Sequence, residues 1–158
     1  MQKSTICLTY NDQAEEAAKH YTSIFKDSKI IQTVSMGAQG ISEAGDKVLL
    51  VMFEMNGVKY MALNGGPSFS FTHGTSIMVN CDTQDEIDFV WDRLCEGGKE
   101  VECGWLVDKF GVSWQVVPSM LGKLMDARTP DRAKRVFDAL MKMKKLSIPT
   151  LQKAYDGV

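Results

Sequence analysis

Residues 103–118 read CGWLVDKFGVSWQVVP and carry the most informative pattern in the chain. Asp108 and Gly111 mark the start and end of a tight turn, which suits type I geometry, and an apolar strand is expected on each side of it. Side chains of a strand alternate between two faces, so Gln115 and its neighbour Trp114 point in opposite directions. A glutamine in the middle of an apolar strand is therefore the first candidate for a functional side chain.

Composition places the chain among ordinary globular proteins. It has 158 residues, a formal net charge of −2, 44% hydrophobic and 24% charged residues, which predicts one compact domain or two fused half-domains. The slight acidity argues against a nucleic-acid partner, and no apolar run is long enough to span a membrane. The chain opens without a signal peptide, and its four cysteines show no CxxC or CxxH spacing. We therefore expect free thiols and a cytoplasmic location.

The first half predicts one helix and four strands. Asn11 or Asp12 is expected to cap the helix, with Glu15 completing a pattern like a capping box. Asn56-Gly57 is the strongest hairpin signal in the chain, and glycine-containing runs at 37–40 and 43–46 indicate a loop. The order is βαβββ, with strands expected at residues 4–10, 29–35, 47–55 and 58–64.

The second half repeats this order at an offset of about 70 residues. Thr83 and Glu86 form a capping box, and the helix that follows is expected to end at Gly97-Gly98. Strands are expected at residues 75–81, 99–103, 104–108 and 112–117. A single four-stranded unit would leave one sheet face bare, so the two copies are expected to join their sheets around a common cavity. The predicted class is α+β.

Three short helices are expected after Pro118. Thr129 caps the second of them with Pro130 at its first position, and Pro149 opens the last. These pieces are too short to fold alone and should pack on the sheets or on a partner chain. We place the boundaries at 1–66 for the first module, 67–118 for the second and 119–158 for a C-terminal helical extension, all in one globular unit. The apolar stripe of the second helix is expected to contain Ala133, Val136, Phe137, Leu140 and Met141.

The βαβββ order and the run from Asp108 to Pro118 together resemble the vicinal oxygen chelate superfamily of glyoxalases, bleomycin-resistance proteins and extradiol dioxygenases. Within it, the chain is most similar to the PhnB-like branch, often labelled "3-demethylubiquinone-9 3-methyltransferase". The resemblance implies a cupped mixed sheet built from the two repeats and a homodimer. The blocks that carry it are Asn64-Gly65-Gly66-Pro67 with Phe69, Phe71 and Thr72, then 82–94 with Gly97-Gly98, then 103–118 and 134–157.

The superfamily resemblance also implies up to four metal ligands, usually His, Glu or Gln, from strands of both halves. In this sequence they would fall near Thr5 or Cys7, near Tyr60 or Ala62, near Ser76 and at Gln115. Only Gln115 is a ligand of the usual type, and a lone neutral amide oxygen holds Zn, Mn or Fe poorly. We therefore expect no functional metal and no cofactor.

The candidate site residues each have a functional and a structural interpretation. Gln115 either hydrogen-bonds a ligand or is satisfied within the sheet. Trp105 lines a pocket or belongs to the core, and Cys103 is a reactive or an inert thiol. Tyr60 and Ser76 complete the pocket candidates as the residues at the expected ligand positions.

Three further candidates lie where the two halves meet. Phe69 and Phe71 cover a pocket mouth, anchor a dimer or pack on the sheet. Asn64 either positions a ligand or serves the turn at Gly65-Gly66.

Three functions compete. The first is a metal-free, dimeric protein that binds or sequesters a small molecule. The alternative is a metal-dependent enzyme of the glyoxalase or dioxygenase type. A methyltransferase is less favoured, because the glycine run at 37–40 neither follows the first strand nor opens a helix, as a nucleotide-binding turn requires.

Overall fold

The computed structural model describes residues 3–37 and 45–158. The chain divides into two compact units, Met1–Ser70 and Phe71–Val158, here called the first and second units. Most of the loop expected from the two glycine-containing runs lies outside the described residues. No helix among the described residues is long and apolar enough to cross a membrane.

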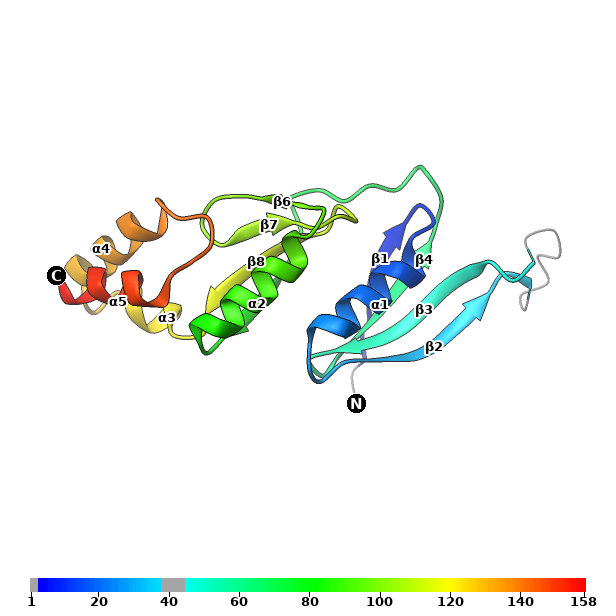
Figure 1. The fold of residues 1–158 in the computed structure, drawn as a ribbon, viewed down its shortest axis with the longest axis horizontal. Helices are drawn as coiled ribbons and strands as arrows, with labels where there is room; N and C mark the ends of the chain where they lie inside the picture. The colour runs from blue at the N-terminus through cyan, green and yellow to red at the C-terminus, as the bar shows by residue number, and fades with distance from the viewer. Residues whose placement is uncertain (1–2, 38–44) are drawn as a thin grey trace. The chain divides into compact units, whose positions relative to one another are not determined.

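The first unit has the predicted βαβββ order (Figure 1), with β1 (Ile6–Tyr10), α1 (Ala14–Ile24), β2 (Lys29–Ser35), β3 (Val48–Met55) and β4 (Val58–Asn64). The sheet order is β1-β4-β3-β2, parallel between β1 and β4 and antiparallel elsewhere. The Asn56-Gly57 hairpin is confirmed: φ is 49° at Asn56 and 75° at Gly57. Two successive positive φ values are the signature of a type I′ turn, whose twist matches that of the flanking strands.

The predicted cap of α1 is wrong. The N-cap residue is Gln13, and its side chain makes no capping hydrogen bond. Instead Asn64 Oδ1, at the end of β4, accepts the Ala14 N–H at 2.8 Å, while Asn64 Nδ2 donates to the Val48 carbonyl at 2.9 Å. A residue distant in sequence therefore satisfies the free N–H at the helix start, and it ties α1 to both central strands.

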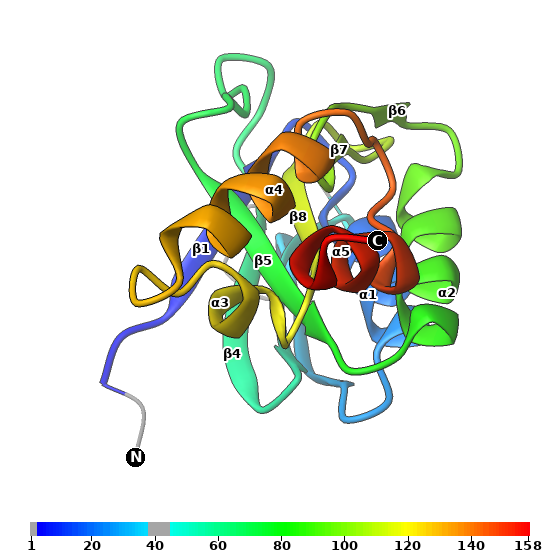
Figure 2. The ribbon, with the colours of Figure 1, turned by 90° about the vertical axis from the view of Figure 1, so that its left-hand side faces the viewer.

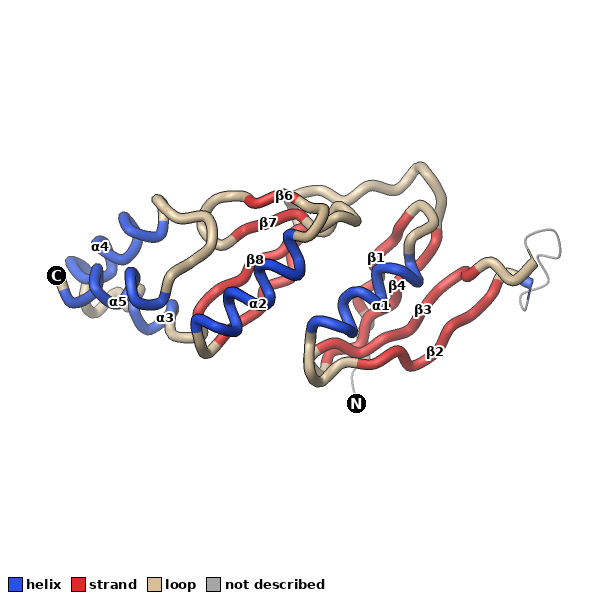
Figure 3. Tube along the Cα trace, viewed as in Figure 1, coloured by secondary structure: helices blue, strands red, loops and turns tan. Residues whose placement is uncertain are grey.

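The second unit repeats the architecture, with β5 (Ser76–Cys81), α2 (Gln84–Cys95), β6 (Lys99–Glu100), β7 (Trp105–Val107) and β8 (Ser113–Pro118). Its sheet order, β5-β8-β7-β6, corresponds strand for strand to that of the first unit, and β5 and β8 are again the parallel pair. Figure 3 shows α1 beside the strands of the first unit and α2 beside those of the second. The α+β class and the two βαβββ repeats are thus confirmed.

The capping box of α2 is confirmed, whereas β6 and β7 are shorter than expected. Thr83 Oγ1 accepts the Glu86 N–H at 3.2 Å, and the Glu86 carboxylate accepts the Asp82 N–H at 2.8 Å. Between β6 and β7 the chain turns at Cys103 and Gly104, whose φ values are +61° and +82°. This left-handed pair is incompatible with an extended chain, so it interrupts the predicted strands.

In each unit the helix covers one face of the sheet. The sheet residues on that side are buried, as with Val51 and Phe53 in the first unit and Trp114 and Val116 in the second, all at 0% exposure. Some residues on the other face are more exposed, such as Met78 of β5 at 53%, although Val117 of β8 is buried there at 7%. The face turned away from the helix is called the open face below.

Helices α3 (Leu121–Leu124), α4 (Pro130–Leu140) and α5 (Ile148–Asp156) form a group of their own next to the second sheet (Figure 2). On α4, Val136 is fully buried, but Phe137 and Met141 of the predicted stripe are 47% and 51% exposed. The apolar stripe of α4 is therefore only partly covered by the rest of the second unit. The helices share a buried core made of Val117, Leu124, Val136, Leu146 and Leu151.

Candidate functional site

The hairpin within residues 103–118 is held by a buried carboxylate. Asp108 is 3% exposed, and its Oδ1 accepts the backbone N–H groups of Phe110 and Val112 at 2.9 and 3.0 Å. Its Oδ2 accepts the Trp114 indole N–H at 2.8 Å. The Gly111 N–H bonds to the Asp108 carbonyl, and Gly111 has a φ of +88°, which gives a tight turn followed by a left-handed residue. The buried Asp108 side chain therefore stabilises the turn through its hydrogen bonds.

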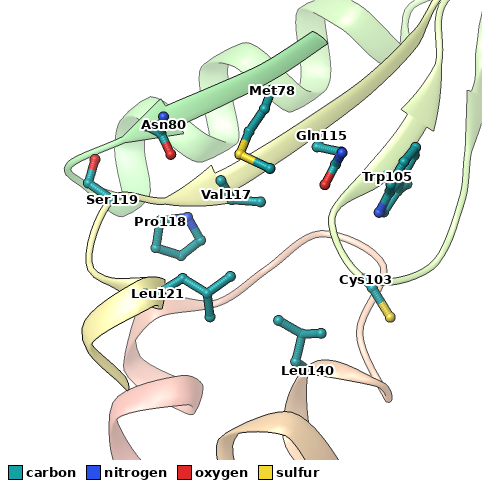
Figure 4. A pocket seen from close by; sticks show the side chains of 11 residues that line it. Met78, Asn80, Cys103, Trp105, Gln115, Val117, Pro118, Ser119, Leu121 and Leu140 are labelled. Atoms are coloured by element: carbon teal, nitrogen blue, oxygen red, sulfur yellow. The ribbon is translucent and has the colours of Figure 1, made fainter. Parts of the chain in front are cut away.

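This hairpin presents its open face to a pocket of about 500 Å³ within the second unit. In register across three strands lie Met78, Gln115 and Trp105, which form the floor. Figure 4 shows Met78, Gln115 and Val117 pointing from the sheet toward Leu121 and Leu140, which belong to the C-terminal helices. Pockets of this size hold small organic molecules. The remaining lining residues are Asn80, Cys103, Pro118, Ser119 and Gly122.

Gln115 is the most central polar residue of the floor. Its Nε2 donates to Ser76 Oγ at 2.9 Å, so two of the predicted site residues lie together on the open face. One N–H of the amide donates to Ser76, and the amide oxygen is the acceptor of the Gln115 side chain. Figure 4 shows this oxygen on the side of Leu140. Trp114 lies on the opposite face, as the alternation predicts, with 0% exposure.

Cys103 lies at the pocket edge beside Trp105. Its Sγ is 3.5 Å from Met141 Sδ, and its N–H donates to the Met143 carbonyl at 2.7 Å. All four cysteines are free thiols. Burial, followed by the charges of Glu86 and Asp82, raises the pKa of Cys81 to about 11, which marks that thiol as unreactive.

Tyr60 belongs to the first unit, on the helix-facing side of its sheet, and is not one of the residues that line the pocket. It is 6% exposed and stacks on Phe53 with ring centroids 5.3 Å apart. Burial raises the pKa of its hydroxyl. The open-face neighbours of Tyr60 on β4 are Lys59 and Met61, neither of which is a metal ligand of the usual type.

The three candidates between the halves are placed in different surroundings. Asn64 holds α1 to the sheet, as described above. Phe69 is 55% exposed and lies over Gly65, where an added Cβ would come within 2.9 Å of its ring. Phe71 is half-buried in the second unit, beside Gly111 of the hairpin turn.

The donor set of the pocket does not fit a divalent metal. Gln115 and Ser76 offer a neutral amide and a hydroxyl, and the opposite strand positions hold Met78 and Trp105. Zn, Mn and Fe are held by several imidazole, carboxylate or thiolate ligands together. Within residues 3–37 and 45–158, no three His, Cys, Asp or Glu side chains are grouped so that they could hold a metal ion.

Sequence reasoning missed the residues that line the pocket from β5 and from the C-terminal helices: Met78, Asn80, Leu121, Gly122 and Leu140. The alternation of β8 combined with parallel pairing to β5 would have found Met78, because it lies opposite Gln115 in register. No local signal identified Leu121 and Leu140, because their position depends on how the helices pack.

The two βαβββ modules have the same strand order, which is the arrangement expected for the vicinal oxygen chelate superfamily. The family described as 3-demethylubiquinone-9 3-methyltransferase matches residues 2–117, and the chain belongs to this PhnB-like family. The match ends before the block 134–157, which had also been part of the resemblance.

Solved structures support the same assignment. A PhnB protein from Bacillus cereus, named as a 3-demethylubiquinone-9 3-methyltransferase, is 34% identical over 73% of this chain and 99% of its own, with a TM-score of 0.66. A Pseudomonas aeruginosa protein (21% identity, 75% and 98% coverage, TM-score 0.63) shares the fold. So does the fosfomycin resistance protein FosX of Listeria monocytogenes (17%, 77% and 94%, TM-score 0.55). A search of curated proteins found no match.

Proposed function

We propose that this protein binds a small organic molecule without a metal, in the pocket on the open face of its second sheet. The observation that carries the proposal is the pocket floor, in which Gln115 stands between Met78 and Trp105. An amide oxygen among apolar and aromatic side chains orients a ligand but does not activate one. The proposed activity is therefore binding or sequestration.

We further propose that the protein acts as a homodimer in the cytoplasm. Free thiols at all four cysteines are in keeping with a reducing compartment. Large apolar side chains such as Ile6 and Phe89 are 47% and 52% exposed, which favours burial against a second copy. Light scattering of the purified protein tests the dimer, and a stable monomer at micromolar concentration would contradict it.

The alternative is a metal-dependent enzyme, since one structure of the Listeria FosX is a complex with Mn(II). Elemental analysis of the purified protein discriminates the two. Under our proposal Zn, Mn, Fe and Ni are each well below one equivalent per chain, and ligand binding is the same in EDTA as in added Mn²⁺. A stoichiometric metal that is needed for binding would overturn the proposal.

The family's name suggests a methyltransferase as a further alternative. S-adenosylmethionine methyltransferases typically bind their cofactor at a glycine-rich turn between a strand and a helix. In this chain β1 is followed by α1 through Asn11, Asp12 and Gln13, without a glycine. Calorimetry with S-adenosylmethionine should detect no binding, and micromolar affinity would revive this function.

Gln115→Leu tests the site itself. A screen of small aromatic compounds by thermal shift, run in EDTA, supplies the probe. Loss of one neutral hydrogen bond should weaken binding of a hydrogen-bond-donating hit by about 2- to 10-fold. Gln32→Leu, at an exposed strand position of the first unit, is the matched control and should leave the affinity unchanged. Equal affinity in both variants would place the ligand elsewhere.

A further inference from the structure

The second wall of the pocket is made by a part of the chain that the family match does not include. The family match ends at residue 117. The alignment with the Bacillus cereus protein includes 99% of that protein but only 73% of this chain. Yet Leu121, Gly122 and Leu140 line the pocket opposite the sheet (Figure 4). The C-terminal extension, residues 119–158, therefore decides the shape of this pocket.

Within the second unit, the extension is bonded to the β6–β7 turn and to α2. The Gly104 N–H donates to the Lys144 carbonyl at 2.8 Å, one residue along from the bond between Cys103 and Met143. Lys145 Nζ lies 2.8 Å from an Asp92 carboxylate oxygen and 3.3 Å from one of Asp88 on α2. Burial lowers the pKa of Lys145, but hydrogen bonds to these two carboxylates outweigh it and leave the pKa raised.

A second fastening joins α2 to the start of α5. The Gln84 side chain donates through Nε2 to the Leu146 carbonyl at 3.2 Å and accepts the Ile148 N–H through Oε1 at 2.8 Å. Gln84 thus uses both ends of its amide on the extension. Hydrogen bonds at the β6–β7 turn and hydrogen bonds and ion pairs on α2 therefore hold the extension in place as one wall of the pocket.

The lining of the pocket contains no charged side chain. Apolar surface comes from both walls, with Met78 and Trp105 on the sheet and Leu140 on the extension. The polar lining side chains are neutral: Asn80, Cys103, Gln115 and Ser119. Burying an anion in such surroundings without a cation to pair it is strongly unfavourable.

We propose that the extension makes this a pocket for an uncharged, flat, apolar molecule that carries one hydrogen-bond donor, and that it selects against anions. The donor would meet Gln115 Oε1, which lies on the side of Leu140 (Figure 4). The ring system would lie between Trp105 and the leucines of the extension. The inference rests on the proposed function and adds the ligand class and the segment that sets it.

Three naphthalene probes of one size test the ligand class by calorimetry near neutral pH. These are 2-naphthol, which is neutral and has a donor, 2-methoxynaphthalene, which is neutral and lacks one, and 2-naphthoate, which is an anion. We expect 2-naphthol to bind best, the ether about 2- to 10-fold more weakly for the lost hydrogen bond, and the anion at least about 10-fold more weakly. Naphthoate binding as tightly as naphthol would overturn the proposed class.

Gly122→Leu tests the wall. A Cβ at Gly122 meets no atom within 4 Å, so the new side chain enters open space at the pocket without a clash. We expect it to reduce 2-naphthol binding by at least about 10-fold through occlusion. Lys123→Leu is the matched control, since the same side chain is added one position along the helix at an exposed residue outside the lining. Equal affinities of the two variants would contradict the role of the extension.

Indole N–H resonances locate the probe independently of affinity. The protein has three tryptophans. The indoles of Trp91 and Trp114 donate to Glu100 and Asp108, whereas Trp105 lines the pocket. Binding of 2-naphthol should shift the Trp105 signal most. If none of the probes binds, the proposed function itself fails. The other outcome is that a probe binds and shifts the Trp105 signal, but the anion binds more tightly than 2-naphthol or Gly122→Leu leaves the affinity unchanged. In that case only the present inference fails.

Discussion

Replacing Asp108 by asparagine should destabilise the second unit while changing hardly any volume. The carboxylate accepts from the Phe110 and Val112 backbone and from the Trp114 indole, and all three partners are donors. In Asp108→Asn the amide oxygen can still serve the two backbone groups. The new NH₂ group then faces the indole N–H, so two buried donors point at one another.

The magnitude follows from the lost bond. A hydrogen bond to a charged group is worth about 1.5–3 kcal/mol, and leaving a buried donor unsatisfied costs about 1–3 kcal/mol. We therefore expect a loss of about 3 kcal/mol in the free energy of unfolding. A domain has about 5–15 kcal/mol in all, so the variant should still fold at low temperature.

Urea unfolding followed by tryptophan fluorescence is the assay, because all three tryptophans belong to the second unit. The matched control is Asp131→Asn, at an exposed position in the first turn of α4. Its unfolding free energy should stay within about 0.5 kcal/mol of the original protein. In a double-mutant cycle with Trp114→Phe, the coupling to Asp108→Asn should be about 1.5–3 kcal/mol. A cost below 0.5 kcal/mol for Asp108→Asn, or additive effects in the cycle (about 0 coupling), would refute the reasoning.

Two further predictions concern other parts of the chain. Asn64→Ala should lower the stability of the first unit by about 1–3 kcal/mol, because the Ala14 N–H and the Val48 carbonyl both lose their hydrogen-bond partner. Hydrogen exchange of the α1 amides measures this loss of stability. Unchanged protection of these amides would contradict the prediction. Burial is the main cause that raises the pKa of Cys81 and Cys95 to about 11, so the native state favours the neutral thiols. Their contribution to stability is present below about pH 9 and is lost as the pH rises through about 11. Unfolding free energies measured across this range should fall less in a Cys81→Val variant, and an equal fall would count against the assignment.

The fold was largely predictable because its signals are local. Alternating apolar residues and the Asn56-Gly57 turn place β3 and β4 to within a residue, and the repeat at about 70 residues predicts the strand order of the second unit from the first. The start of α1 was mispredicted for the opposite reason. Its cap comes from Asn64, which lies 50 positions further along the chain, and no local pattern encodes such a partner.

The site was predictable only in part. Gln115, Ser76, Trp105 and Cys103 were named from the sequence, and the first three lie on the open face of one sheet. The β4 sequence VKYMALN is apolar on both faces, so its alternation gave no means of telling which side of the sheet Tyr60 would take. The leucines of the extension depend on tertiary packing and had no sequence signature.

The two faces of the second sheet explain how the fold of this family can be kept while the chemistry of its site changes. Trp114, Val116 and Leu106 are all at 0% exposure and supply the packing that stabilises the unit. Met78 on the open face is 53% exposed, so it contributes little to that packing. Exposed side chains on that face can therefore change at a smaller cost in stability than the fully buried helix-facing residues. The hairpin at 103–118 contains both kinds of residue in alternation, and for this reason one stretch of sequence identifies the superfamily while lacking the ligands of its usual metal site.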